Sequence, residues 1–134
     1  MYGLALYDGP HGGGTVFELS PNRDGSWTAK LLHAFYYFDG SKGYYPGDLI
    51  FDSSGDLYGV ASGGVVTACD GGCGVVFKLT PKGNGEWKES VVHSFIDKPG
   101  DGPLGIVFDA AGNLYGTTAG NLGTTYGSVF EIFP

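Results

Sequence analysis

Short apolar runs alternate with glycine-rich and polar turns along the whole chain. Residues 27–35 show the pattern clearly, because Ala29 and Leu31 alternate with Thr28 and Lys30. A period of two residues predicts β-strands, and no segment has the period of an amphipathic helix. The pattern predicts ten strands: residues 2–6, 15–20, 27–35, 48–52, 57–62, 75–80, 87–95, 105–109, 114–119 and 128–133.

The predicted turns combine glycine with Asn, Asp or Pro. Residues 54–56 (Ser-Gly-Asp) and 111–113 (Ala-Gly-Asn) place glycine where a tight hairpin needs a positive φ. Pro21 and Pro81 follow predicted strands and end them, because proline has no N–H to donate to a neighbouring strand.

The chain repeats itself. Residues 52–59 read Asp-Ser-Ser-Gly-Asp-Leu-Tyr-Gly, and residues 109–116, at an offset of 57, read Asp-Ala-Ala-Gly-Asn-Leu-Tyr-Gly. A Val-Phe-x-Leu or Val-Phe-x-Ile run begins at Val16, at Val76 and at Val129. A repeat of this length is typical of stacked or ring-shaped arrays of one supersecondary unit.

The repeated unit contains four strands. In chain order they are an all-apolar strand, a Leu-Tyr-Gly strand, a Val-Phe-x-Leu strand and a long strand from Trp to Phe. This pattern predicts an all-β, propeller-type repeat array of four-stranded antiparallel blades, with about two and a half blades per chain. We expect one domain, with units at approximately residues 1–56, 57–113 and, in part, 114–134.

A propeller ring contains about four to eight blades, so we expect copies of this chain to associate, as a dimer that supplies five blades. If copies joined head to tail, two strands of the four-strand repeat would be missing at each junction between copies.

Residues 49–51 and 106–108 are apolar throughout. We therefore expect these two innermost strands to be buried on both faces, with residues 105–109 lining the central channel.

Composition narrows the function classes. The 134 residues carry a net charge of −7, which disfavours nucleic acid and anionic membrane surfaces as partners. The sequence contains no apolar run of about 18 residues, so we predict no membrane-spanning helix. No signal peptide is visible in this sequence. The 26 glycines suit many short strands joined by tight turns.

Both cysteines lie in one short segment. Cys69 and Cys73 are separated by Asp-Gly-Gly, which lets the chain curl back and bring the sulfurs together. We predict a loop disulfide, which suits an oxidising compartment. A reduced pair, or half of a zinc site with about four ligands, is the alternative reading.

Several phrases of the sequence resemble one bacterial repeat family. They are Gly-Asn-Leu-Tyr-Gly-Thr-Thr at 112–118, Gly-Ser-Val-Phe-Glu-Ile at 127–132, the run at 13–21 and Leu-Leu-His-Ala-Phe at 31–35. Together they resemble the GloVer tandem repeats of bacterial choice-of-anchor proteins, and the hairpin is also similar to NHL-type propeller repeats. The resemblance implies an extracellular or cell-surface bacterial protein, and it supplies no catalytic motif.

Aromatic residues give the best candidate binding site. Tyr36, Tyr37, Tyr44 and Tyr45 flank a polar loop that is three residues longer than its repeat equivalent. Tyrosine has a flat apolar face and a polar tip, which suits contacts with a glycan or with a protein. His11, in an earlier loop without a repeat equivalent, joins these candidates, and packing of the tyrosines between blades is the alternative.

Acidic residues give a rival, catalytic hypothesis. Glycoside hydrolysis needs two carboxyl groups about 5–10 Å apart. Asp39, Asp97 and Asp101 precede the innermost strands, where their loops would open at one face of a ring. Asp52 and Asp109 hold equivalent hairpin positions, so turn formation explains them.

The sequence offers no established catalytic pattern. His33 and His93 share one repeat position, which favours a structural role for both. We expect no cofactor and no metal. The sequence therefore favours an extracellular module for structure or binding that self-associates into a ring. A carbohydrate-active enzyme, or a fragmentary or engineered propeller piece without a ligand, is the alternative.

Overall fold

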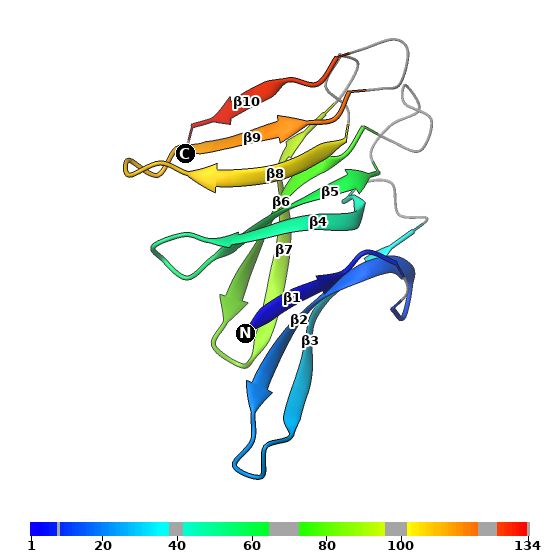
Figure 1. The fold of residues 1–134 in the computed structure, drawn as a ribbon, viewed down its shortest axis with the longest axis vertical. Helices are drawn as coiled ribbons and strands as arrows, with labels where there is room; N and C mark the ends of the chain where they lie inside the picture. The colour runs from blue at the N-terminus through cyan, green and yellow to red at the C-terminus, as the bar shows by residue number, and fades with distance from the viewer. Residues whose placement is uncertain (8, 38–41, 65–72, 96–101, 121–125, 134) are drawn as a thin grey trace.

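The computed structural model of this chain describes residues 1–7, 9–37, 42–64, 73–95, 102–120 and 126–133 (Figure 1). These residues form ten strands and no helix. The strands are β1 (Tyr2–Ala5), β2 (Gly12–Pro21), β3 (Trp27–Tyr36), β4 (Tyr44–Phe51), β5 (Leu57–Gly63), β6 (Val75–Lys82), β7 (Glu86–Ser94), β8 (Pro103–Phe108), β9 (Leu114–Thr118) and β10 (Val129–Ile132). Each overlaps a predicted strand, and the all-β prediction is confirmed.

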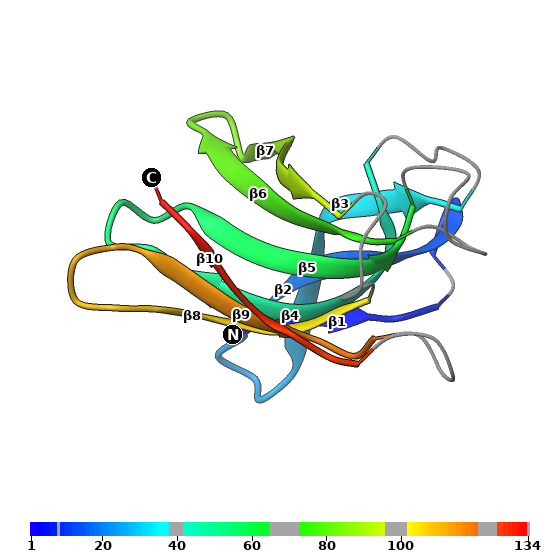
Figure 2. The ribbon, with the colours of Figure 1, turned by 90° about the horizontal axis from the view of Figure 1, so that it is seen from above.

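The strands form three separate antiparallel sheets. The first has the order β1-β2-β3, the middle one β4-β5-β6-β7 and the third β8-β9-β10. The middle sheet therefore has the four-strand order that the repeat predicts, and Figure 2 shows it as a twisted fan from β7 to β4. Within the described residues, the first sheet has no counterpart of β4, and the third has no counterpart of β7.

A glycine faces a phenylalanine across the same strand pair in all three sheets. The directly paired residues are Gly3–Phe17, Gly59–Phe77 and Gly116–Phe130. A Cβ added to Gly59 would lie 2.3 Å from Cζ of Phe77 and 2.7 Å from the backbone oxygen of Asp48. Only glycine leaves room for the ring, which explains why Leu-Tyr-Gly and Val-Phe-x-Leu recur together.

The sheets stack on one another through contacts that also repeat. The equivalent ring pairs are Phe35–Phe77 and Phe95–Phe130, both 5.0 Å between centroids, and Tyr2–Phe51 and Tyr58–Phe108, at 4.8 and 5.1 Å. Phe35–Phe77 and Tyr2–Phe51 join the first sheet to the middle one. Phe95–Phe130 and Tyr58–Phe108 join the middle sheet to the third. One geometric step therefore relates each sheet to the next.

The middle sheet packs against a neighbouring sheet on each of its two faces. One apolar cluster lies between it and the first sheet: Val16, Leu32, Phe35, Leu57, Ala61, Val75, Phe77 and Leu79. A second lies between it and the third sheet: Val60, Val76, Ile106 and Leu114. Successive side chains of a strand point to opposite faces, so the neighbours Val75 and Val76 belong to different clusters.

The prediction that residues 49–51 and 106–108 are buried on both faces is wrong. Phe51 is exposed, and Val107 is 56% exposed. Both segments lie in β4 and β8, which are edge strands of their sheets. Within the middle sheet, most of the fully buried side chains belong instead to the central strands β5 and β6, such as Val60 and Val76. Whether β8 lines a channel stays a prediction.

Replacing Gly59 by alanine tests the glycine–phenylalanine contact. We expect Gly59→Ala to lower the free energy of unfolding by about 1–3 kcal/mol, because the new methyl group overpacks against Phe77 and the β4 backbone. Urea denaturation measures the change. Gly83→Ala is the control, because a Cβ at that position meets nothing within 4 Å. Equal stability of both variants would contradict the contact's role.

Candidate functional site

The predicted aromatic residues meet at one end of the first and middle sheets. Tyr36 ends β3, and β4 begins at Tyr44, four residues earlier than predicted, so Tyr44 and Tyr45 belong to this strand. Ring centroids lie 5.0 Å apart for Tyr37 and Tyr44, 4.8 Å for Tyr44 and Tyr45, and 4.9 Å for Tyr45 and Tyr7. These four residues, Tyr7, Tyr37, Tyr44 and Tyr45, form the tyrosine cluster.

His11 and Tyr36 form a separate, adjacent pair. Their rings stack with centroids 3.6 Å apart and an interplanar angle of 12°. The backbone N–H of Tyr37 donates to the carbonyl of His11 at 3.3 Å, which joins this pair to the tyrosine cluster. The structure thus brings all five predicted residues together. Sequence reasoning missed Tyr7, although it lies beside the loop that holds His11.

Tyr45 has an unusual backbone. Its φ is 59°, which makes it the one non-glycine residue with a positive φ in the described part of the chain. The repeat-equivalent residue is Gly102, with a φ of 74°, and a proline follows each of them, Pro46 and Pro103. A side chain in this region costs on the order of 1–3 kcal/mol, and such strain gathers at functional sites.

The tyrosine cluster is accessible to solvent and uncharged. Tyr7 and Tyr37 are exposed, whereas Tyr44 and Tyr45 are half-buried. Burial, a hydrogen bond with Tyr37 and the neighbouring phenols raise the pKa of Tyr45. The hydroxyl group of Tyr45 therefore stays protonated at neutral pH. The cluster offers apolar ring faces together with neutral hydrogen-bonding tips.

A polar group lies beside the aromatic residues, between the first and middle sheets. The Glu89 side chain of β7 is only 3% exposed, and its Oε2 lies 3.5 Å from His33 Nε2 and 3.5 Å from Lys42 Nζ. A cavity of about 60 Å³ adjoins it, lined by His33, Phe35, Tyr36, Lys42, Gly43 and Glu89. Sequence reasoning missed Glu89, whose repeat equivalent is Ala29. The difference between Glu89 and Ala29 at equivalent repeat positions could have identified Glu89 from the sequence as a candidate functional residue.

His33 is a packed, neutral imidazole. Its ring contacts Phe35 edge-on at 4.6 Å, and His93 contacts Phe95 in the same way at 4.8 Å. Burial, with help from the positive charge of Lys42 and from His11, lowers the pKa of His33 to about 4. At neutral pH its contact with Glu89 therefore joins a neutral ring to a carboxyl group and is not a salt bridge.

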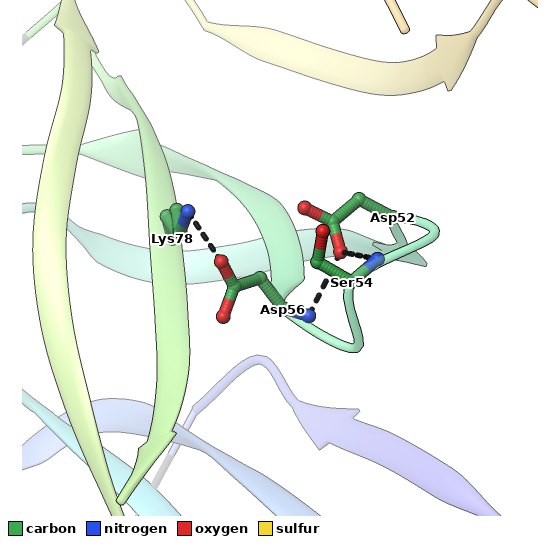
Figure 3. Close-up of polar contacts among 4 residues, drawn as sticks. All are labelled: Asp52, Ser54, Asp56 and Lys78. Carbon is green, nitrogen blue, oxygen red and sulfur yellow. Dashed lines mark hydrogen bonds and ion pairs between the residues drawn. The ribbon is translucent and has the colours of Figure 1, made fainter.

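The hairpin aspartates are occupied by turn bonds. Oδ1 of Asp52 accepts the N–H groups of Ser54 and Asp56, both at 2.9 Å, while the Asp56 carboxylate pairs with Lys78 (Figure 3). Asp109 makes the same two backbone bonds in its own hairpin. Hydrogen bonds, first from the Asn113 side chain, lower the pKa of Asp109, whereas a general acid needs a raised pKa.

Other predicted residues lie outside the described ones, namely Asp39, Asp97, Asp101 and Cys69. Cys73 is buried and disulfide-bonded, and the Cys69–Cys73 pairing stays a prediction. The described residues contain no group of three His, Cys, Asp or Glu side chains able to hold a metal ion. They also contain no helix long and apolar enough to cross a membrane.

Comparison with known families identifies the repeat. The model of the Gloeobacter/Verrucomicrobia repeat matches residues 1–134. The chain belongs to this family. The resemblance to GloVer repeats is thereby confirmed. No curated protein and no solved structure matches the chain.

Within this chain of the Gloeobacter/Verrucomicrobia repeat family, two departures from its own repeat lie close to each other. They are Tyr45 in place of Gly102 and Glu89 in place of Ala29. Both lie at the junction of the first and middle sheets, where the tyrosine cluster and the small cavity are found. A residue that differs between otherwise equivalent units is not needed by the unit itself, so this junction is the candidate site.

The buried imidazole predicts a pH dependence of stability. The pKa of His33 is about 4 in the folded protein, below its ordinary value of 6.5. As pH falls from 6.5 to about 4 the unfolded chain takes up the proton first, so the folded state loses stability, by at most about 3 kcal/mol. Urea denaturation across this range should show a shallower decline for His33→Gln. The control is His93→Gln, at the exposed equivalent position, which should match the wild type. Identical pH profiles for all three proteins would contradict the assignment.

Proposed function

We propose that this chain is an extracellular structural and binding module of a propeller-type array, and that its copies associate to complete a ring. Three observations support this architecture: the separate antiparallel sheets, the four-strand order of the middle sheet and the repeated step between sheets. The disulfide-bonded Cys73 favours an oxidising compartment, such as the bacterial cell surface.

We further propose that the tyrosine cluster recognises a ligand. Tyr45 carries this proposal, because a tyrosine occupies a backbone conformation that the equivalent repeat assigns to Gly102. The fold itself requires no side chain there. Tyrosine at this position strains the backbone, and the compensating benefit is the ring surface that Tyr45 shares with Tyr7 and Tyr44.

A glycan suits this surface best. Sugar rings present C–H faces that lie against aromatic rings and hydroxyl groups that bond to phenolic tips. The cluster supplies both, and the exposed stack of His11 and Tyr36 extends it. No lysine or arginine is among these aromatic residues, and the neighbouring Lys42 lies 3.5 Å from the Glu89 carboxyl group, so the chemistry of the aromatic surface favours a neutral ligand. A protein surface is the other partner that tyrosines suit, and it is an outcome of the test below.

The alternative function is a carbohydrate-active enzyme. A cavity of about 370 Å³ between the hairpins of β4–β5 and β8–β9 favours it, since Asp52 and Asp109 both line this cavity. Both carboxylates, however, accept backbone N–H groups of their own turns, and the pKa of Asp109 is lowered. A hydrolase needs one carboxyl group with a raised pKa, so we place this function second.

Replacing Tyr45 by glycine separates recognition from packing. Glycine accepts the positive φ without strain, so we expect Tyr45→Gly to keep or gain stability while glycan-array binding falls at least about tenfold. Thermal denaturation and the glycan array are measured on the same preparation. Tyr126→Ala is the matched control, because the Tyr126 side chain is 94% exposed and Tyr126 is not one of the cluster residues.

Two results would count against recognition by the cluster. If Tyr45→Gly loses stability and binds as the wild type does, the ring serves packing. If wild-type protein binds no glycan but captures a protein ligand that Tyr45→Gly does not, the partner is a protein. Hydrolysis of a glycan on the array by the wild type would instead support the enzyme.

A further inference from the structure

The two end sheets each carry an exposed apolar face. On the third sheet, Val129 is 77% exposed, whereas its repeat equivalent in the middle sheet, Val76, is fully buried. On the first sheet, Trp27 is 53% exposed, whereas its equivalent, Trp87, packs against the core. The difference arises because the middle sheet has a neighbour on both sides and each end sheet has only one.

The two internal interfaces show what each kind of face accepts. In the middle sheet, the face that carries Val60 and Val76 packs against the third sheet, which contributes Ile106, Leu114 and Phe130. The same two kinds of face meet between the first and middle sheets, where Val16 packs in one cluster with Leu57 and Phe77. One interface is thus used twice within the chain.

The exposed end faces are the two halves of that interface. Val107 and Val129 on the third sheet are the repeat equivalents of Ile50 and Val76. On the first sheet, Phe17 pairs directly with Leu31 and is the equivalent of Phe77 and Phe130; Leu31 is 50% exposed. The exposed face of the third sheet therefore carries the side chains of one side of the internal interface, and the exposed face of the first sheet carries those of the other side.

We propose that the outer face of sheet β8–β10 binds the outer face of sheet β1–β3 of a second copy of this chain, so that two copies close a ring of six sheets. This inference rests on the self-association proposed above and specifies its surfaces. Three sheets from each of two copies give six, within the range of about four to eight blades. The expectation of five blades came from grouping the twenty strands of a dimer in fours, whereas the ten strands of each copy form three separate sheets.

The seam of this ring should be weaker than the internal interfaces. Of the two aromatic pairs between the middle and third sheets, Tyr58–Phe108 uses Phe108 of β8, and Phe95–Phe130 uses Phe95, which directly follows β7. At the seam, the first sheet has no counterpart of β4 or β8, and the third has no counterpart of β7, within the described residues. The seam thus lacks both aromatic pairs, and dilution should separate the copies while each stays folded.

A charge placed on either face tests the inference. We expect wild-type protein to sediment at twice its 14.0 kDa mass at high concentration and to dissociate on dilution. Val129→Lys and Leu31→Lys should each weaken association at least about tenfold, since a buried unpaired ammonium group is costly. Gly83→Lys adds the same charge to an open turn of the middle sheet and should associate like the wild type. Circular dichroism tests whether each variant is folded. If Val129→Lys does not fold, Val107→Lys takes its place as the variant of the third sheet.

The outcomes separate the two proposals. A wild-type protein that is monomeric at every concentration overturns both the self-association and these surfaces. A wild-type dimer that persists in both face variants overturns the surfaces alone and favours pairing through strand edges. Loss of the dimer in both face variants, but not in Gly83→Lys, supports the inference. Glycan binding is a separate measurement, and its result does not alter this one.

Discussion

The rest of the structure depends on a phenylalanine ring lying over a glycine within each sheet. Phe77 covers Gly59 and at the same time meets the edge of Phe35 from the preceding sheet. The ring therefore links pairing inside one sheet to stacking between two. Because Phe130 repeats this arrangement over Gly116, the same step carries the chain from each sheet to the next.

The strands and turns could be predicted from residues adjacent in sequence. The burial of each strand depends on contacts between segments far apart in sequence. The hairpin glycines Gly55 and Gly112 adopt φ values of 87° and 89°, as their turn sequences predict, because turn geometry depends on a few adjacent residues. Burial of residues 106–108 was predicted wrongly, because it depends on which strand lies at a sheet edge. Glu89 and Tyr7 were missed because their contacts join segments far apart in sequence.

The repeat itself separates structural from functional residues. Positions that recur, such as His33 and His93 against their phenylalanines, are explained by the unit that they pack. Positions that do not recur need another explanation, and Tyr45 is the clearest, because its counterpart is a glycine with the same sign of φ. In a repeat protein, the comparison between units within one chain thus gives evidence that usually requires homologous sequences.

Ring closure and recognition would use different parts of the molecule. The proposed seam lies on the outer faces of the end sheets, whereas the tyrosine cluster lies at the junction of the first and middle sheets, at the start of β4. Closure of the ring would therefore leave the tyrosine cluster of each of the two copies accessible to a ligand. Because rotation about the ring axis relates the two copies, both clusters would open at the same rim, and a repetitive glycan could engage them together with an affinity above that of either one.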